Sequence, residues 1–235
     1  MNEEDIELPK HLATLAENIE EVTRLVEIHK EIAGAKQGRK SGVEVLNKSA
    51  IVLLVACWET FIEEIASVAF NLILKDAPNP YVFPNKVLVL ASRDLRKHKD
   101  ETKVWELAAS GWKRVLRKHR DSILSKFVSP FNTPNTQNIN RLFNDLVGIK
   151  NISFDWYWQR MSVSQTKTKL DRLIKLRGQI AHSVRTEKSV HKTTVIGYVH
   201  FIKRLAGVIN NSLNEYIEER TGSSPWCHVD YVGQE

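Results

Sequence analysis

The sequence contains only two cysteines in 235 residues, Cys57 within an apolar segment and Cys227 near the C-terminal end. Such sparse usage provides no disulfide framework and indicates a reducing compartment. Long hydrophobic runs are also missing, since the longest, residues 50–58, has nine residues, whereas a membrane span needs about 20. The N-terminal residues are acidic where a signal peptide requires a basic region. We therefore expect a cytoplasmic protein with no membrane partner.

The motifs of common cofactor-dependent and metal-dependent enzymes are absent as well. There is no Gly-x-x-x-x-Gly-Lys loop, no Gly-x-Gly-x-x-Gly turn, no Gly-x-Ser-x-Gly, no Cys-x-x-Cys and no His-Glu-x-x-His. His191 and His200 are nine residues apart and lack an obvious third ligand for zinc. We therefore expect no cofactor and no metal site.

The sequence does contain many apolar residues at spacings of three and four, the pattern of helices that bury one face. This pattern predicts long helices over residues 9–32, 43–75 and 190–220. Among the shorter helices, one is expected over residues 134–147, with Thr133 as its N-cap. No segment shows a convincing strand pattern. The sequence therefore predicts an all-α fold, an antiparallel bundle of six or seven helices.

The length of the chain suits a single domain. We predict one helical domain over residues 1–222, with its core at residues 43–220. Residues 223–235 have no periodicity and are predicted to form a flexible tail or to lie on the surface.

Charge is distributed unevenly along the chain. The formal net charge is +6, but residues 1–31 contain nine acidic and only three basic residues. Residues 93–126 contain eleven basic and five acidic residues, a density that suits contact with the phosphates of RNA. The candidate RNA contacts in this segment are Lys113, Arg114, Arg117 and Lys118. A solvated helix face is the alternative interpretation.

The most informative stretch is KLDRLIKLRGQIAHS, residues 169–183, which predicts an amphipathic helix. Counting along its apolar stripe brings Arg177 onto the face expected to be buried. Burying a guanidinium without a partner is costly, so such an arginine pairs with a carboxylate, lines a cleft or binds an anion. His182 follows, between the small residues Ala181 and Ser183, which leave room for a ligand.

A permanent cation and an imidazole at one phosphate could cleave RNA without a metal, because the 2′-hydroxyl can attack its own phosphorus and leave a cyclic phosphate. The spacing of five, however, separates Arg177 and His182 by about 140° on an ideal helix. The reach of the arginine, or a loss of helical geometry near Gly178, must close that gap.

Two further Arg-x-x-x-x-His pairs occur in the sequence, Arg93 with His98 and Arg114 with His119. Both lie in the basic segment, where such spacings arise easily by coincidence. Neither combines an arginine on an apolar stripe with a histidine beside small residues. We therefore choose the pair in residues 169–183 as the candidate catalytic pair.

Three segments together resemble the HEPN superfamily, in particular its RiboL-PSP branch. They are ACWETFIEEI at residues 56–65, FNTPNTQNINRLFNDLVGI at residues 131–149, and LRGQIAHS at residues 176–183. The resemblance extends over residues 47–217. It implies an all-helical bundle, commonly dimeric, whose active members cut RNA without metal through an Arg-x(4 to 6)-His motif.

On this chain the motif falls on Arg177 and His182. By resemblance, Arg177 would hold the phosphate and His182 would act on the 2′-hydroxyl or the leaving oxygen. Glu59 matches an acidic residue of this branch and would orient Arg177, whereas its sequence context alone leaves open a solvated acid at the edge of an apolar stripe. Gln179 and Ser183 are candidate supporting residues.

The resemblance implies a homodimeric endoribonuclease, an effector of phage defence or of a toxin-like system, with RNA as substrate and an antitoxin or other regulatory protein as a further partner. Lys169 and Arg172 add candidate RNA contacts. Gly178 stands where the family usually has a polar residue, and members with altered motifs serve as binding or assembly domains. The alternatives are therefore a non-catalytic RNA-binding or scaffolding dimer, and a structural dimer in which Glu59 neutralises Arg177.

Overall fold

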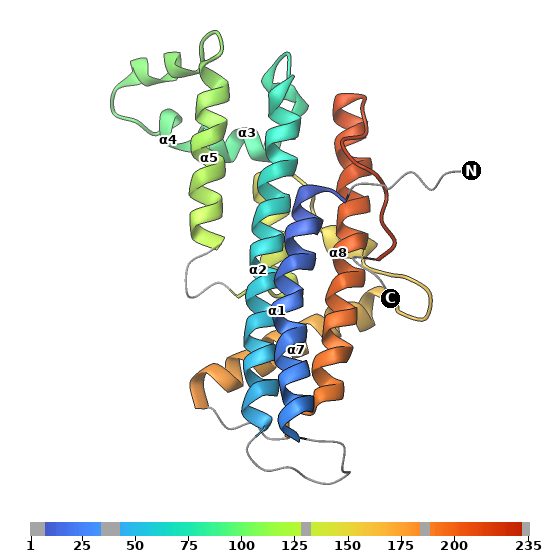
Figure 1. The fold of residues 1–235 in the computed structure, drawn as a ribbon. Coiled ribbons are helices and arrows are strands. Elements are labelled where there is room, and N and C mark those ends of the chain that lie inside the picture. Colours follow the sequence, from blue (N-terminus) through green and yellow to red (C-terminus); the bar gives the residue numbers. More distant parts are fainter. Residues whose placement is uncertain (1–7, 34–42, 128–132, 184–188, 232–235) are drawn as a thin grey trace, which may run out of the picture. The chain divides into compact units, whose positions relative to one another are not determined.

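The computed structural model of the protein describes residues 8–33, 43–127, 133–183 and 189–231. These residues form α-helices and short 3₁₀ helices (Figure 1). The α-helices are α1 (Lys10–Ala33), α2 (Glu44–Lys75), α3 (Asn85–Ala91), α4 (Arg93–Arg96), α5 (Gly111–Phe127), α6 (Thr136–Leu146), α7 (Val163–Ser183) and α8 (Lys192–Thr221), and the 3₁₀ helices are η1 (Pro80–Val82), η2 (Glu101–Leu107) and η3 (Ile152–Asp155). The described ranges contain no strand and one isolated bridge, between Trp158 and Met161. The predicted all-α fold is confirmed.

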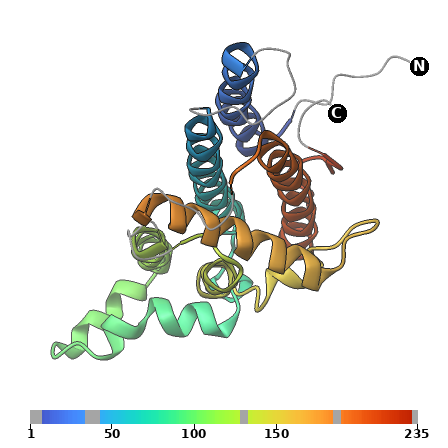
Figure 2. The ribbon, with the colours of Figure 1, turned by 90° about the horizontal axis from the view of Figure 1, so that it is seen from below.

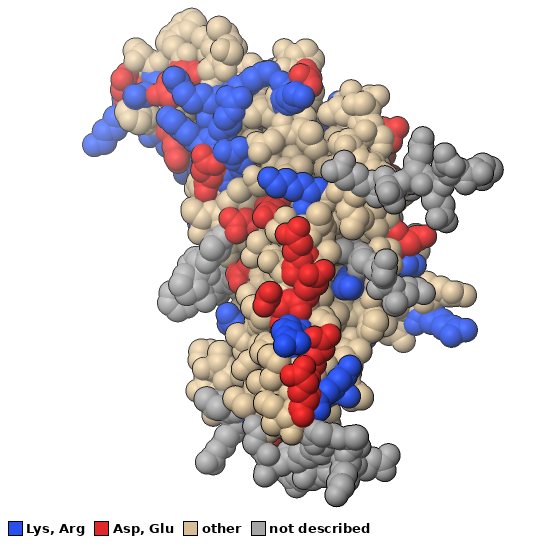
Figure 3. Space-filling model, in the orientation of Figure 1, with Lys and Arg blue, Asp and Glu red and all other residues tan. Residues whose placement is uncertain are grey.

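The three long helices expected from the sequence are α1, α2 and α8, and their ends lie within two residues of the predicted ones. Their apolar spacing explains this agreement. On α1, for example, Leu12, Leu15 and Ile19 are buried, while the exposed face of the helix carries the acidic side chains visible in Figure 3. No described helix combines the length and the apolar character that crossing a membrane requires.

The chain divides into two compact units. The first contains Met1–Phe61, Asp155–Asn211 and Cys227–Glu235, and the second contains Ile62–Phe154 and Ser212–Trp226. The first unit therefore includes α1, α7 and the N-terminal parts of α2 and α8, whereas α3 to α6 belong to the second. The single domain over residues 1–222 stays a prediction.

In the first unit, α7 crosses the direction of α1 and of the N-terminal parts of α2 and α8 (Figures 1 and 2). Buried polar contacts connect the long helices. His11 Nε2 lies 2.8 Å from Asn210 Oδ1, which links α1 to α8. Asn47 Nδ2 donates to the Val190 carbonyl at 2.8 Å, which links α2 to the segment before α8. These contacts fix the frame on which α7 lies.

The tail also makes specific contacts in its described part. In the first unit, Val229 N donates to Asn211 Oδ1 at 2.9 Å, and Asn211 Nδ2 donates to the Val229 carbonyl at 3.1 Å. In the second unit, Trp226 N donates to Asn214 Oδ1 at 3.3 Å. Residues 223–231, predicted to be flexible or to lie on the surface, are thus hydrogen-bonded to side chains of α8.

In the second unit, α5 packs against α3, α6 and η2. The N-cap of α6 is Asn135, whose Oδ1 accepts from Asn138 N at 2.9 Å. The prediction of Thr133 as the cap is wrong. The Thr133 hydroxyl and carbonyl instead accept hydrogen bonds from the side chains of Asn135 and Asn138. Asparagine caps a helix as well as threonine does, so the competing residue two positions later prevails.

Two histidines, the buried His11 and the half-buried His119, make the stability of the fold depend on pH. Burial lowers the pKa of His11 below its usual 6.5, an effect that outweighs the hydrogen bond with Asn210. Burial likewise lowers the pKa of His119 in the second unit, against the hydrogen bond with Asp145. Because the unfolded chain then binds protons before the native chain as the pH falls, the free energy of unfolding decreases below about pH 6.5.

We expect urea denaturation to show this decrease between pH 7.5 and 5.5, with a slope of at most about 1.4 kcal/mol per pH unit for each histidine. His11→Gln keeps a side-chain amide for Asn210 but cannot titrate, so its stability should depend less on pH than that of the wild type. Equal pH dependence in the two proteins would contradict the role of His11.

Candidate functional site

The candidate catalytic pair lies on α7, which begins with a capping box. Ser162 N donates to Gln165 Oε1 at 2.9 Å, and Gln165 N donates to Ser162 Oγ at 3.3 Å. These reciprocal bonds satisfy two backbone donors that would lack partners at the start of the helix. The helix then continues through Gly178 to Ser183. The loss of helical geometry that could have brought Arg177 and His182 together is therefore not observed.

Arg177 lies on the inner side of α7, as the apolar spacing predicted. Leu173 and Leu170, one and two turns earlier on the same side, are fully buried. The Arg177 side chain is half-buried, and its Nε is buried without a hydrogen-bond partner among the described residues. A buried cationic donor without a partner is unfavourable, so this position favours an anionic ligand.

His182 occupies the opposite side of the helix end. It is exposed, as are Ala181 and Ser183. The helical repeat places the Arg177 and His182 side chains about 140° apart around the axis. Within one chain, the two residues therefore point in different directions, and His182 is open to a ligand or to another protein chain.

The three proposed supporting residues lie in the same unit. Glu59 is half-buried on α2, and Gln179 is half-buried on α7. The Ser183 hydroxyl donates to the Gln179 carbonyl at 2.8 Å, one turn back along the helix. This bond fixes the serine at the helix end, and the functional roles of all three residues stay predictions.

The two alternative histidines have other partners. His98 Nδ1 accepts a hydrogen bond from Asp100 N at 3.0 Å in the turn before η2. His119 donates from Nε2 to the Asp145 carbonyl at 2.8 Å, which joins α5 to α6. Both histidines thus have hydrogen-bond partners within the fold, and the choice of His182 stays a prediction.

A basic surface covers α4, η2 and the adjoining part of α5 (Figure 3). Arg114, Arg117 and Lys118 are exposed there. Lys113 differs, because its Nζ donates to the Lys75 carbonyl at 3.3 Å and lies 5.4 Å from the centre of the Trp112 ring. The predicted RNA contacts on α5 thus comprise three exposed cations and one lysine engaged within its own unit.

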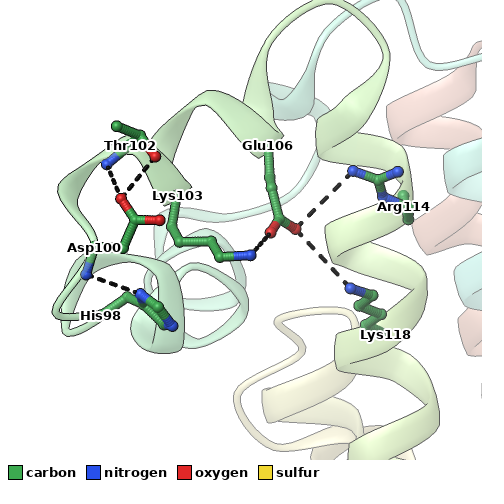
Figure 4. Close-up of polar contacts among 7 residues, drawn as sticks. All are labelled: His98, Asp100, Thr102, Lys103, Glu106, Arg114 and Lys118. Atoms are coloured by element: carbon green, nitrogen blue, oxygen red, sulfur yellow. Dashed lines mark hydrogen bonds and ion pairs between the residues drawn. The ribbon is translucent and has the colours of Figure 1, made fainter.

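The basic surface has an acidic centre that the sequence analysis missed (Figure 4). Glu106 Oε1 lies 3.1 Å from Lys103 Nζ, while Oε2 lies 4.0 Å from an Arg114 nitrogen and 3.9 Å from Lys118 Nζ. The hydrogen bond and charge of Lys103, followed by the charges of Lys118 and Arg114, lower the pKa of Glu106. The spacing of three between Lys103 and Glu106 was the available signal, since it suits one turn of a 3₁₀ helix.

The two predicted RNA contacts on α7 differ in exposure. Arg172 is exposed. Lys169 is half-buried, with its Nζ 4.9 Å from the centre of the Phe201 ring, and this burial lowers its pKa. Arg172 is therefore the more accessible of the two to a phosphate.

No group of three His, Cys, Asp or Glu side chains in the described ranges is placed to hold a metal ion.

Comparison with known proteins identifies the family to which the chain belongs. Searches of curated proteins and of solved structures gave no match. A profile of the RiboL-PSP-HEPN family matches residues 13–215, most of the chain, including Glu59, Arg177 and His182. The chain therefore belongs to the RiboL-PSP-HEPN family.

Proposed function

We propose that this protein is a metal-independent endoribonuclease. Arg177 holds the scissile phosphate and stabilises the negative charge that develops on it. His182 moves a proton at the 2′-hydroxyl or at the 5′ leaving oxygen. The 2′-oxygen forms a bond to phosphorus as the bond to the 5′-oxygen breaks, which leaves a 2′,3′-cyclic phosphate and a 5′-hydroxyl.

The observation that carries this proposal is the placement of Arg177. Its Nε is buried on the inner side of α7 and has no hydrogen-bond partner among the described residues. A phosphate oxygen would supply the missing acceptor as well as the opposite charge. Family membership and the basic surface of α5 support RNA as the source of that phosphate.

The wide angle between Arg177 and His182 on one helix suits a homodimer. A two-fold axis near the end of α7 brings Arg177 of one chain toward His182 of its partner, so the site contains both groups without any bending of the helix. We further propose that the enzyme acts in the cytoplasm as a phage-defence or toxin-like effector, restrained by an antitoxin or another regulatory protein.

The chemistry of the cut ends tests the proposal. We expect the purified protein to cut mixed RNA in EDTA and to leave 2′,3′-cyclic phosphate and 5′-hydroxyl ends, because the attacking group belongs to the RNA. An RNA with a 2′-deoxy sugar at the cleaved nucleotide should stay intact at that position. Fragments with 5′-phosphates, or cleavage that EDTA abolishes, would contradict the mechanism.

A non-catalytic RNA-binding dimer is the second candidate. The continuity of α7 through Gly178 favours it, since Arg177 and His182 of one chain do not face the same point. Salt-dependent RNA binding by a protein that cuts no RNA, with or without EDTA, would select this function.

A further inference from the structure

Close local contacts define both ends of the 3₁₀ helix η2. At its start, Asp100 Oδ1 accepts from Thr102 N at 3.0 Å and from Thr102 Oγ1 at 2.7 Å (Figure 4). At its end the chain turns sharply into α5, with Ala109 at a φ of 50°. A Cβ atom on Gly111 would lie 2.0 Å from the Glu106 carbonyl oxygen, so only glycine fits there. The tight turn fixes Glu106 beside the first turns of α5.

The cations around Glu106 converge on one point. Three nitrogens, those of Lys103, Arg114 and Lys118, lie within 4.0 Å of its carboxylate. The Glu106 side chain is only 25% exposed, whereas the side chains of Arg114 and Lys118 are 63% and 70% exposed. One negative charge thus occupies a site of three positive charges that stays open to solvent. Such a convergent set fits a discrete anion such as a phosphodiester.

An unusually exposed tryptophan lies next to this site. Trp105 is 75% exposed, and its neighbours Val104 and Leu107 on η2 are exposed as well. With three residues per turn, Trp105 projects about 120° away from Glu106 around the axis of η2. The indole is therefore not used to pack η2 on α5, and one of its faces is available to a planar ligand.

We propose that η2 and the start of α5 bind single-stranded RNA, with an unpaired base stacked on Trp105 and a neighbouring phosphate held by Lys103, Arg114 and Lys118 in place of Glu106. Stacking requires an unpaired base, because the bases of a duplex are already stacked on one another. Glu106 orients the three cations in the free protein and competes with the phosphate. This inference rests on the proposed RNA function and specifies its substrate class.

An anionic lipid surface would attract the same cations and the same tryptophan. Two features favour RNA. The cations converge on one carboxylate rather than spreading over a plane, and η2 has seven residues, too few for the broad apolar face of a helix that lies in a membrane interface.

The test measures fluorescence anisotropy of a labelled single strand of 2′-O-methyl RNA, which 2′-hydroxyl attack cannot cut, bound to the full chain. We expect Trp105→Ala to weaken binding by about 5- to 150-fold, the range for losing one stacked base. Binding of a duplex of the same length should not change. The matched control is Tyr81→Ala, which removes an aromatic side chain that is 80% exposed on η1.

The second variant tests the competition by Glu106. Glu106→Gln should tighten binding about fivefold at low salt, as expected for removing one charge at about 4 Å in water, and should steepen the salt dependence. Glu101→Gln removes the same charge from the first turn of η2 and should change affinity less. Circular dichroism confirms that each variant is folded.

The inference would be overturned if Trp105→Ala bound the single strand as tightly as the wild type does. It would also be overturned if Glu106→Gln gained no more affinity for the single strand than Glu101→Gln. A third contradicting result would be binding to phosphatidylserine vesicles that depends on Trp105, together with RNA binding that does not. That result would assign the surface to lipid. These results do not depend on catalysis. If the protein cuts no RNA but shows the expected changes in RNA affinity, the proposed binding site stands and the proposed enzyme activity fails. If it cuts RNA without those changes, the enzyme activity stands and this binding site fails.

Discussion

Replacing His182 by alanine is expected to lower the single-turnover rate of RNA cleavage by about 10²- to 10⁴-fold, the usual contribution of a general acid or base. His182 is exposed at the end of α7, so its loss removes proton transfer without opening a cavity. The rate is measured in EDTA with saturating protein, so that binding and chemistry are separated.

Arg177→Ala should cause a comparable loss, because a preorganised positive group is removed from the developing charge. The double variant should be little slower than either single variant, since the proposed mechanism has both side chains acting on one phosphate. Stability provides an independent readout. The Arg177 Nε has no hydrogen-bond partner among the described residues, so the substitution should not lower the free energy of unfolding as loss of a structural arginine would.

The histidines in the basic segment provide the controls. His98→Ala and His119→Gln should leave the single-turnover rate nearly unchanged, because both histidines are hydrogen-bonded to backbone groups outside the proposed site. Glutamine at position 119 keeps a donor for the Asp145 carbonyl. A wild-type rate in His182→Ala, together with an inactive His98 or His119 variant, would show that the wrong pair was chosen.

Mixing the two inactive single variants tests whether the site is shared between chains. Random exchange of subunits makes half of the dimers hybrid. Each hybrid has one intact site, with Arg177 from one chain and His182 from the other, and one site in which both residues are alanine. The mixture should therefore regain about a quarter of wild-type activity. No recovery, despite subunit exchange shown by differently labelled chains, would place both residues of a site in one chain.

The sequence predicted the long helices because their apolar residues recur at the helical period and decide which face is buried. It did not predict η2 or the contacts of the tail. These depend on partners that are far away in the sequence, or on backbone atoms that approach one another closely. Gly111 is needed only because the Glu106 carbonyl lies against it. Val229 is bound by both groups of one Asn211 amide, a contact that no periodicity encodes.

The same limit applies to the candidate site. Counting residues placed Arg177 on the inner face of α7, since that position depends only on the helical repeat. Whether the helix would end near Gly178 could not be read from the sequence. Glycine weakens a helix by about 1 kcal/mol relative to alanine, and the buried contacts of Leu170, Leu173 and Ile180 outweigh that preference.

The second large effect is expected from reversing the exposed cations of α5. The triple variant changes Arg114, Arg117 and Lys118 to glutamate. It should weaken RNA binding on the order of 100-fold at about 50 mM salt. It should also reduce the slope of log affinity against log salt by about 2, because each lost phosphate contact accounts for about 0.7 on a single strand. Lys113 is left unchanged, since its Nζ bonds to the Lys75 carbonyl and its reversal would also disturb folding.

A variant of equal net charge separates local contacts from the overall field. Lys10→Glu, Lys30→Glu and Lys150→Glu reverse three cations that are exposed elsewhere on the chain, so both triple variants bring the formal net charge from +6 to zero. If the α5 cations contact phosphates, only their reversal lowers the salt slope by about 2, because the slope counts the counterions released at the contact. Equal losses of affinity and slope in the two variants would mean that RNA is attracted by net charge alone, and α5 would then have no specific role in binding.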